Sequence, residues 1–203
     1  IGAAGLGLSE TLAWSFSGVL PEATSLDALT MATPLDSVKT STGLGLTLHE
    51  ITAGPLFGGY AGIGWEWINF AYLAGGLYLI HRRAVAWQIP VGMLGALFVI
   101  ALLFHGSDTD AFPSPLFHLF SGAAMLGAFF IATDPITAST TPRGRLIYGA
   151  GIGVLTYVIR TWGGFPDGVA FAVVLMNMAT PTIDYYTKPR VFGTTRGGKG
   201  DGP

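Results

Sequence analysis

Long apolar runs follow one another along this chain from residue 65 onward. They cover residues 65–80, 85–104, 116–133, 146–162 and 168–186. Each run is close to the roughly 20 residues that a helix needs to cross a hydrocarbon core of about 30 Å. Because lipid cannot satisfy an open backbone, runs of this length predict helices. The pattern therefore predicts an all-α polytopic membrane protein with about five transmembrane helices. The first and third runs are short, which favours a small tilt or a partly re-entrant course.

The residues around these runs are more polar and divide the chain into three parts. We expect residues 1–64, which include a hydroxyl-rich stretch and a loop punctuated by Gly and Pro, to form an extracytoplasmic or interfacial segment. Residues 65–186 form the predicted five-helix transmembrane domain, and residues 187–203 a cytoplasmic tail. Because the chain starts with Ile1 rather than Met, we expect it to be part of a longer protein.

Composition agrees with a membrane location and excludes some chemistry. Half of the 203 residues are hydrophobic and only 11% are charged, whereas about a quarter are charged in a soluble domain. The chain has no cysteine, so disulfides, thiolate catalysis and cysteine-ligated iron–sulfur clusters are excluded within it. No basic cluster suggests binding to nucleic acid.

The basic residues gather in alternate loops. Arg82 and Arg83 follow the first run, Arg143 and Arg145 follow the third, and four more follow the fifth, so eight of the ten Lys and Arg residues fall on one side. The positive-inside rule makes that side cytoplasmic. An odd number of spans then places residues 1–64 outside. We therefore predict a multi-pass membrane protein with a cytoplasmic C-terminus and its N-terminal segment outside. In a bacterium the membrane would be the inner membrane and the outside the periplasm.

The most informative polar string runs from Asp27 to Leu35 and reads Asp-Ala-Leu-Thr-Met-Ala-Thr-Pro-Leu. On composition alone it is an ordinary interfacial loop. The string resembles the flavinylation site of the membrane subunits of the Rnf and Na⁺-pumping NADH:quinone reductase families. In those families the last Thr carries FMN through a phosphoester bond, and Thr33 takes that position here. The other positions of the motif are Asp27, Thr30, Met31, Ala32 and Pro34. The family often has Ser-Gly where this chain has Thr30 and Met31.

Further blocks extend the resemblance. Residues 115–135, 139–145 and 160–172 resemble the D subunit of the Rnf complex more closely than the homologous B subunit of the quinone reductase. The resemblance covers about residues 27–192. Proteins of this family are built from two five-helix halves of opposite orientation, which implies that this chain supplies mainly the second half of an inverted repeat.

The resemblance implies a flavin-carrying subunit of an ion-translocating electron transport complex. Such a complex couples electron transfer between ferredoxin and NAD to the movement of Na⁺ or H⁺. The implied cofactor is covalent FMN on Thr33, with room for a second, non-covalent flavin. The implied partners are the A, B, C, E and G subunits of the Rnf complex, the lipid bilayer, and a flavin transferase during maturation. Two alternatives remain open: the B subunit of the quinone reductase, and a redox-inactive permease of the urea-transporter type.

Three residues are candidate flavin contacts. His118 and Ser121 are three positions apart and would share one face of the third span, although a hydrogen bond between helices is the more common use of such residues in bilayers. Arg160 stands at the outer end of the fourth span, where it would meet a flavin or, in the simpler interpretation, extend to the lipid headgroups.

Two residues are candidates for an ion path. Asn177 lies in the middle of the fifth span and should face protein, because a buried amide is costly in lipid; a structural hydrogen bond is the alternative. Asp134 precedes Pro135, which ends the third span or breaks it to line a site. Asp184 is expected to form an interfacial ion pair with Arg190. We assign no catalytic residue, metal site or NAD site within this chain.

Overall fold

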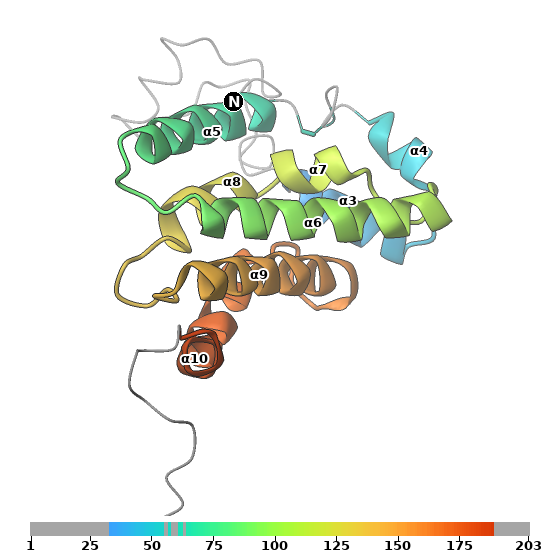
Figure 1. The fold of residues 1–203 in the computed structure, drawn as a ribbon. Helices are drawn as coiled ribbons and strands as arrows, with labels where there is room; N and C mark the ends of the chain where they lie inside the picture. The colour runs from blue at the N-terminus through green and yellow to red at the C-terminus, as the bar shows by residue number, and fades with distance from the viewer. Residues whose placement is uncertain (1–32, 55–56, 58–60, 63, 189–203) are drawn as a thin grey trace, which may run out of the picture.

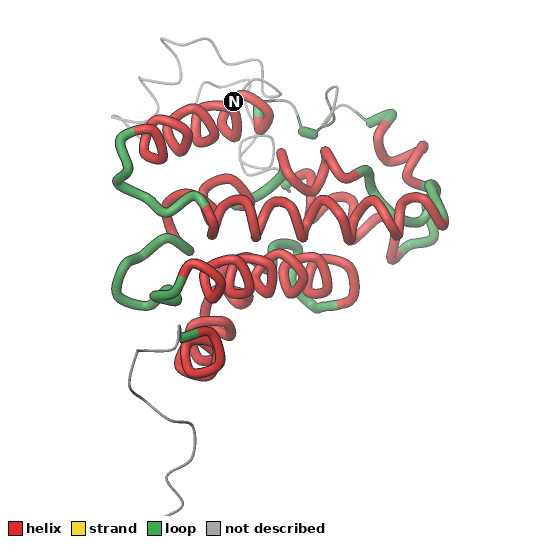
Figure 2. The backbone as a smooth tube through the Cα atoms, viewed as in Figure 1, coloured by secondary structure: helices red, strands yellow, loops and turns green. Residues whose placement is uncertain are grey.

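The computed structural model describes residues 33–54, 57, 61–62 and 64–188. All regular elements within these residues are helical, which confirms the predicted all-α class (Figures 1 and 2). The elements are α3 (Pro34–Gly43), α4 (Leu48–Thr52), α5 (Trp65–His81), α6 (Gln88–Ser107), α7 (Pro115–Phe120), α8 (Ala124–Leu126), the π-helical turn η1 (Gly127–Ile131), α9 (Pro142–Trp162) and α10 (Val169–Thr187).

Four of the five apolar runs form one long helix each. These helices are α5, α6, α9 and α10, of 17, 20, 21 and 19 residues. Within the described part of the chain, α6 is the one helix that is both long and apolar enough to cross a membrane by length and composition. The helix count of the predicted transmembrane domain therefore stays a prediction.

The third apolar run is not a single helix, so the prediction of one continuous helix over 116–133 is wrong. Helix α7 ends at Phe120, and helical structure resumes only at Ala124, where α8 leads into η1. The chain turns at Gly122, whose φ of +62° lies in the left-handed region that suits glycine. The break therefore falls about a dozen residues before Asp134 and Pro135, where the sequence had suggested it.

Helices α6 and α9 form the centre of the molecule and run side by side in the same direction (Figure 1). Glycines allow their backbones to meet. A Cβ on Gly149 would overlap the carbonyl oxygen of Ile89, and one on Gly153 would overlap that of Met93. Small residues at such positions permit the close approach that stabilises helix pairs in membranes. This pair is the support on which the other elements rest.

The two ends of the helix pair carry different groups: basic loops lie at one end and α3 at the other. Arg83 and Arg145, from the loops predicted to be cytoplasmic, line the same surface hollow at one end. At the other end α3 is attached to the last turn of α9, where the Lys39 Nζ donates to the Arg160 carbonyl at 3.1 Å. The Arg-bearing loops thus share one end, and the helix that follows Thr33 lies at the opposite end.

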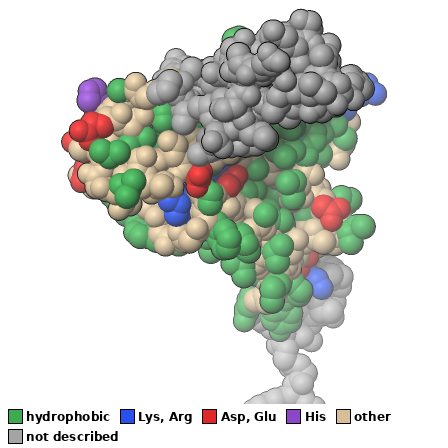
Figure 3. Space-filling view, turned by 180° about the vertical axis from the view of Figure 1, so that it is seen from behind, with side chains coloured by type: hydrophobic (Ala, Val, Ile, Leu, Met, Phe, Trp, Pro, Cys, Tyr) green, Lys and Arg blue, Asp and Glu red, His purple; other side chains and the backbone are tan. Residues whose placement is uncertain are grey.

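Much of the surface is apolar. Large hydrophobic side chains are exposed along α10, among them Phe171, Val174, Leu175 and Met178. Figure 3 shows such side chains gathered on the lower part of the described surface, with few charges among them. A surface of this kind needs lipid or further protein to cover it.

Candidate functional site

Thr33 is the N-cap residue of α3. Its extended backbone places Oγ1 where it accepts a hydrogen bond from the Asp36 N–H at 3.3 Å, and Pro34 occupies the first helical position. The side chain is exposed. A helix N-terminus stabilises phosphate, because its free N–H groups and the helix dipole both favour negative charge. The hydroxyl is therefore accessible and placed where an attached phosphate would be stabilised. The remaining motif positions, Asp27, Thr30, Met31 and Ala32, lie outside the described residues.

Helix α3 is anchored by both apolar and polar contacts. Leu35 and Val38 are buried in a cluster that includes Phe117 of α7. Four positions after Leu35, the ammonium group of Lys39 donates to the carbonyl oxygens of Ile159, Arg160 and Phe165 at 3.4, 3.1 and 3.1 Å. A cation at a helix C-terminus is favourable, so Lys39 stabilises the end of α9. Burial lowers the pKa of Lys39 from its usual value.

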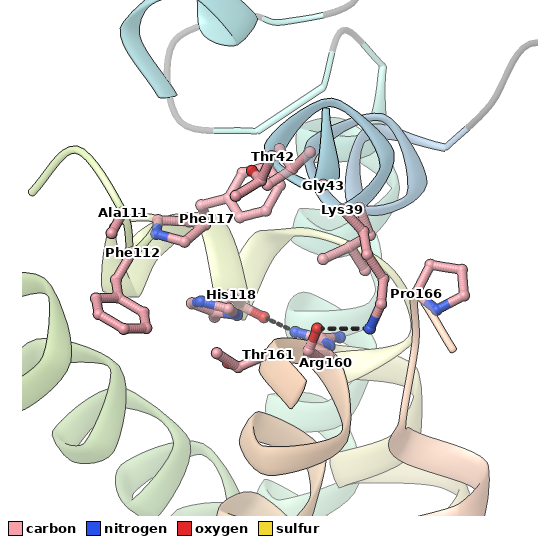
Figure 4. A pocket seen from close by; sticks show the side chains of 13 residues that line it. Lys39, Thr42, Gly43, Ala111, Phe112, Phe117, His118, Arg160, Thr161 and Pro166 are labelled. Carbon is pink, nitrogen blue, oxygen red and sulfur yellow. Dashed lines mark hydrogen bonds between the residues drawn. The ribbon is translucent and has the colours of Figure 1, made fainter. Parts of the chain in front are cut away.

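A pocket of about 310 Å³ lies between α3, α7, the end of α9 and the loop that precedes α7. Lys39, Phe112, Phe117, His118, Arg160 and Thr161 are among the residues that line it (Figure 4). His118 is only 3% exposed, and neither of its ring nitrogens has a hydrogen-bond partner among the described residues. Buried polar atoms are normally paired. The unpaired imidazole therefore marks this pocket as a candidate binding site.

Arg160 stabilises the first side of the break in the third apolar run. Its Nη1 donates to the His118 carbonyl at 2.6 Å and its Nη2 to the Ser121 carbonyl at 3.1 Å, while Asn69 Nδ2 donates to the Phe120 carbonyl at 2.9 Å. These carbonyls end α7 and have no intrahelical partners. Arg160 is 5% exposed, so the interpretation that it extends to the headgroups is wrong. Arg160 is buried because the carbonyl groups at the end of α7 need hydrogen-bond donors.

Asp167 stabilises the second side of the same break. One carboxylate oxygen accepts from Arg160 Nε and Nη2 at 3.2 and 3.1 Å. The other accepts at 2.7 Å from the backbone N–H of Ala123, directly before α8. A carboxylate at the start of a helix complements its dipole. Arg160 and Asp167 thus connect the two half-helices, and we call this pair the break clamp.

The structure brings the three predicted flavin contacts together, but not as the sequence suggested. His118 lies in the last turn of α7, and Ser121 follows the end of that helix. Both are buried and adjoin Arg160. They therefore flank a break instead of sharing the face of a continuous helix. The ring of His118 also packs 5.1 Å from that of Tyr157.

Two residues of this site were not recognised in the sequence. Asn69 lies inside the first apolar run, and Asp167 lies in the loop after α9. A polar amide among apolar residues is the signal that could have identified Asn69, since a buried amide needs partners. Nothing in the local sequence links Asp167 to Ala123, because the contact joins residues 44 positions apart.

The two candidates for an ion path lie apart from the pocket. Asn177 accepts a hydrogen bond from the Tyr148 hydroxyl, which matches the structural alternative for this residue. Asp134 lies in the turn after η1, where it accepts from Thr137 Oγ1 at 2.9 Å. Asp184 accepts from Ser139 Oγ and from Thr140, while its expected partner Arg190 lies outside the described residues.

The exposed apolar helices are typical of a helical membrane protein. The chain belongs to the NQR2, RnfD, RnfE family, whose model matches residues 7–193. The family resemblance predicted from the sequence blocks is thereby confirmed.

Named relatives agree with that assignment. The chain is 58% identical over 173 residues to a protein of Aliivibrio salmonicida (strain LFI1238), with 85% of this chain and 49% of the relative covered. It is 56% identical over 197 residues to one of Pseudomonas aeruginosa (strain UCBPP-PA14), with 96% and 56% covered. Both relatives are named as the D subunit of an ion-translocating oxidoreductase complex. The chain spans about half the length of these relatives.

Proposed function

We propose that this chain is the C-terminal half of the D subunit of an Rnf-type ion-translocating oxidoreductase and carries FMN on Thr33 through a phosphoester bond. The observation that supports the proposal most directly is the position of Thr33. It is an exposed hydroxyl at the N-terminus of α3, followed by Pro34, in the motif that the family resemblance marks. Pro34 has no N–H, so the N–H groups of Leu35 and Asp36 in the first turn of α3 would stabilise the phosphate.

A bound flavin supplies chemistry that the chain itself lacks, because a flavin exchanges electrons in pairs or singly. The residues of this chain hold and orient that group. Thr33 fixes the phosphate to α3, while Leu35 and Val38 anchor α3 against Phe117. Lys39 ties the same helix to the end of α9. Together these contacts keep the attachment point at a fixed position relative to the pocket.

In this proposal the subunit passes electrons within a complex that connects ferredoxin and NAD, with the other Rnf subunits as partners. Moving one charge against 100 mV costs about 2.3 kcal/mol, which a two-electron potential drop of about 50 mV balances. The membrane arrangement we propose has five spans, a periplasmic Thr33 and a cytoplasmic C-terminus. It rests on the apolar runs and on the placement of Arg83 and Arg145 together at the end opposite α3.

The test is covalent flavin on the full-length subunit, produced together with a flavin transferase. Thr33→Val removes the acceptor hydroxyl, and Thr40→Val is the matched control because Thr40 is also a threonine of α3 outside its buried face. We expect in-gel flavin fluorescence and the mass of one FMN in the wild type and in Thr40→Val, and neither in Thr33→Val.

Retained fluorescence in Thr33→Val would place the attachment elsewhere. If the wild type carries no flavin although the transferase modifies a second known substrate in the same cells, the redox function is wrong. A permease would then be the better account of the fold, and solute flux in vesicles would be the next measurement. Quinone reduction by the purified complex would instead favour the B subunit of the quinone reductase.

A further inference from the structure

The charged side chains that line the pocket beside α3 are both basic. Lys39 and Arg160 both line it, and none of its lining residues in the described part of the chain is acidic. The charge of Arg160 is balanced by Asp167 at 3.1 Å. Among the described residues, Lys39 has only carbonyl oxygens as partners. Three donated hydrogen bonds hold it as an ammonium ion with no carboxylate of these residues paired to it, so the described part of the pocket has a net positive charge.

The walls of the pocket suit a flat ring with polar edges. Phe112 and Phe117 supply aromatic surface, and Figure 4 shows the His118 ring between them and Arg160. The imidazole nitrogens of His118 are buried without a partner, so the pocket offers a hydrogen-bonding group that nothing in the described residues uses. A volume of about 310 Å³ lies at the lower end of the range for small-molecule sites, roughly 300–1,000 Å³.

From these observations we propose that the pocket holds a planar, electron-accepting ring that becomes negatively charged on reduction, and that Lys39 sets its reduction potential. Two electrons and one proton leave such a ring with one negative charge, which the ammonium group of Lys39 stabilises at short range. In the proposed function those electrons come from reduced ferredoxin. Phe112, Phe117 and His118 orient the ring.

The source of the ring follows from the position of Thr33. Leu35 lines the pocket and stands only two residues after Thr33, on the same helix. A flavin attached to Thr33 therefore starts within one helical turn of the pocket. This part of the inference rests on the proposed function. A free flavin or a quinone shares the same chemistry, and the experiment separates these sources.

The experiment measures reduction potentials by spectroelectrochemistry on the intact complex, made with the full-length subunit. Lys39→Gln removes the charge, Lys39→Arg keeps it, and Arg82→Gln is the control because it removes an exposed cation at the opposite end of the molecule. We expect the potential of the covalent flavin to fall in Lys39→Gln by about 30 mV or more, a tenfold change in the two-electron equilibrium. Lys39→Arg should restore it, and Arg82→Gln should match the wild type.

Other outcomes would assign the pocket to a different ring or overturn the inference. A fall confined to a non-covalent flavin or quinone in the same sample would support the pocket and assign it to a free ring. Potentials that do not change in Lys39→Gln for any bound ring would overturn the inference, even where Thr33 carries FMN. Absence of FMN on Thr33 overturns the proposed function instead, so the two failures are distinct. If Lys39→Gln does not assemble, the comparison of wild type with His118→Phe decides, with unchanged potential and absorption spectrum counting against the pocket.

Discussion

Gly122 is the residue on which the geometry of the break depends. Its φ of +62° is a conformation that side chains disfavour, and a Cβ there would lie 2.5 Å from both Asp167 Oδ2 and Leu35 Cδ1. The glycine thus lets the backbone turn and lets the break clamp and α3 approach it. One residue without a side chain connects the interrupted helix with the helix that follows Thr33.

Gly122→Ala should therefore destabilise the protein. The left-handed backbone alone costs about 1–2 kcal/mol for a residue with a Cβ, and the contact with Asp167 adds to that cost. Gly95→Ala is the control, since a Cβ on this α6 glycine meets nothing within 4 Å. Thermal unfolding in detergent should show a lower midpoint for Gly122→Ala only. Equal midpoints for both variants would contradict this account of the turn.

At the scale of single residues, the sequence predicted which residues lie at the site better than it predicted what each of them does there. Thr33 and His118 were singled out because motif and polarity mark them locally, and the structure places them on the two elements, α3 and α7, that border the pocket. The role of Arg160 was misjudged because its partners, the carbonyls of His118 and Ser121, lie about 40 positions away. A buried guanidinium and one that extends to the headgroups look the same in a sequence.

At the scale of elements, the interrupted helix is held by opposite charges on its two broken ends. Arg160 donates to the carbonyls that end α7, and Asp167 accepts from the N–H that precedes α8. Arg160 is 1% exposed by side chain and Asp167 is 30% exposed. Removing either partner leaves the other without its counterion. When Asp167 is removed, the unpaired charge is that of Arg160, which is buried.

We expect Asp167→Asn and Arg160→Gln each to lower stability. Because Asp167 is 30% exposed, the loss should fall below the roughly 3–5 kcal/mol of a fully buried pair. Because the two groups act on the same break, the double variant should cost less than the sum of the single ones. Thermal midpoints of the three variants test this. Additive losses would show that the two residues act independently and that no clamp exists.

The break itself could not have been predicted from hydrophobicity. Residues 116–133 are apolar enough to suggest one span, and Ser121 and Gly122 are common inside membrane helices. What interrupts the helix is the set of distant partners that satisfy its free ends, Arg160, Asp167 and Asn69. Apolar length predicts a helix, whereas tertiary hydrogen bonds decide whether it continues.

At the scale of the whole molecule, the helix pair α6 and α9 separates two unlike ends. One carries Arg83 and Arg145, and the other carries α3 and the pocket. The charge pattern of the sequence predicted this division, because the positive-inside rule depends only on which loops alternate. The pocket could not be predicted from the charge pattern, because its lining residues come from four segments that meet only in the folded protein.

The two ends should be reached from opposite faces of the membrane. The chain has no cysteine, so in a full-length subunit whose remaining part is also free of cysteine, Thr40→Cys in α3 and Arg82→Cys after α5 each introduce a single accessible thiol. An impermeant thiol reagent added to intact cells with a permeable outer membrane should label Thr40→Cys alone. In inverted inner-membrane vesicles it should label Arg82→Cys alone. Labelling of both from one side would refute the proposed topology.

The break clamp also has a consequence for biogenesis. The ribosome delivers α7, α8 and η1 well before Arg160 and Asp167, which follow the groups they bind by 39 to 44 residues. Until α9 and the loop after it have emerged, the carbonyls of His118 and Ser121 and the N–H of Ala123 lack these partners. The third apolar run can therefore reach its final form only after the fourth has been synthesised.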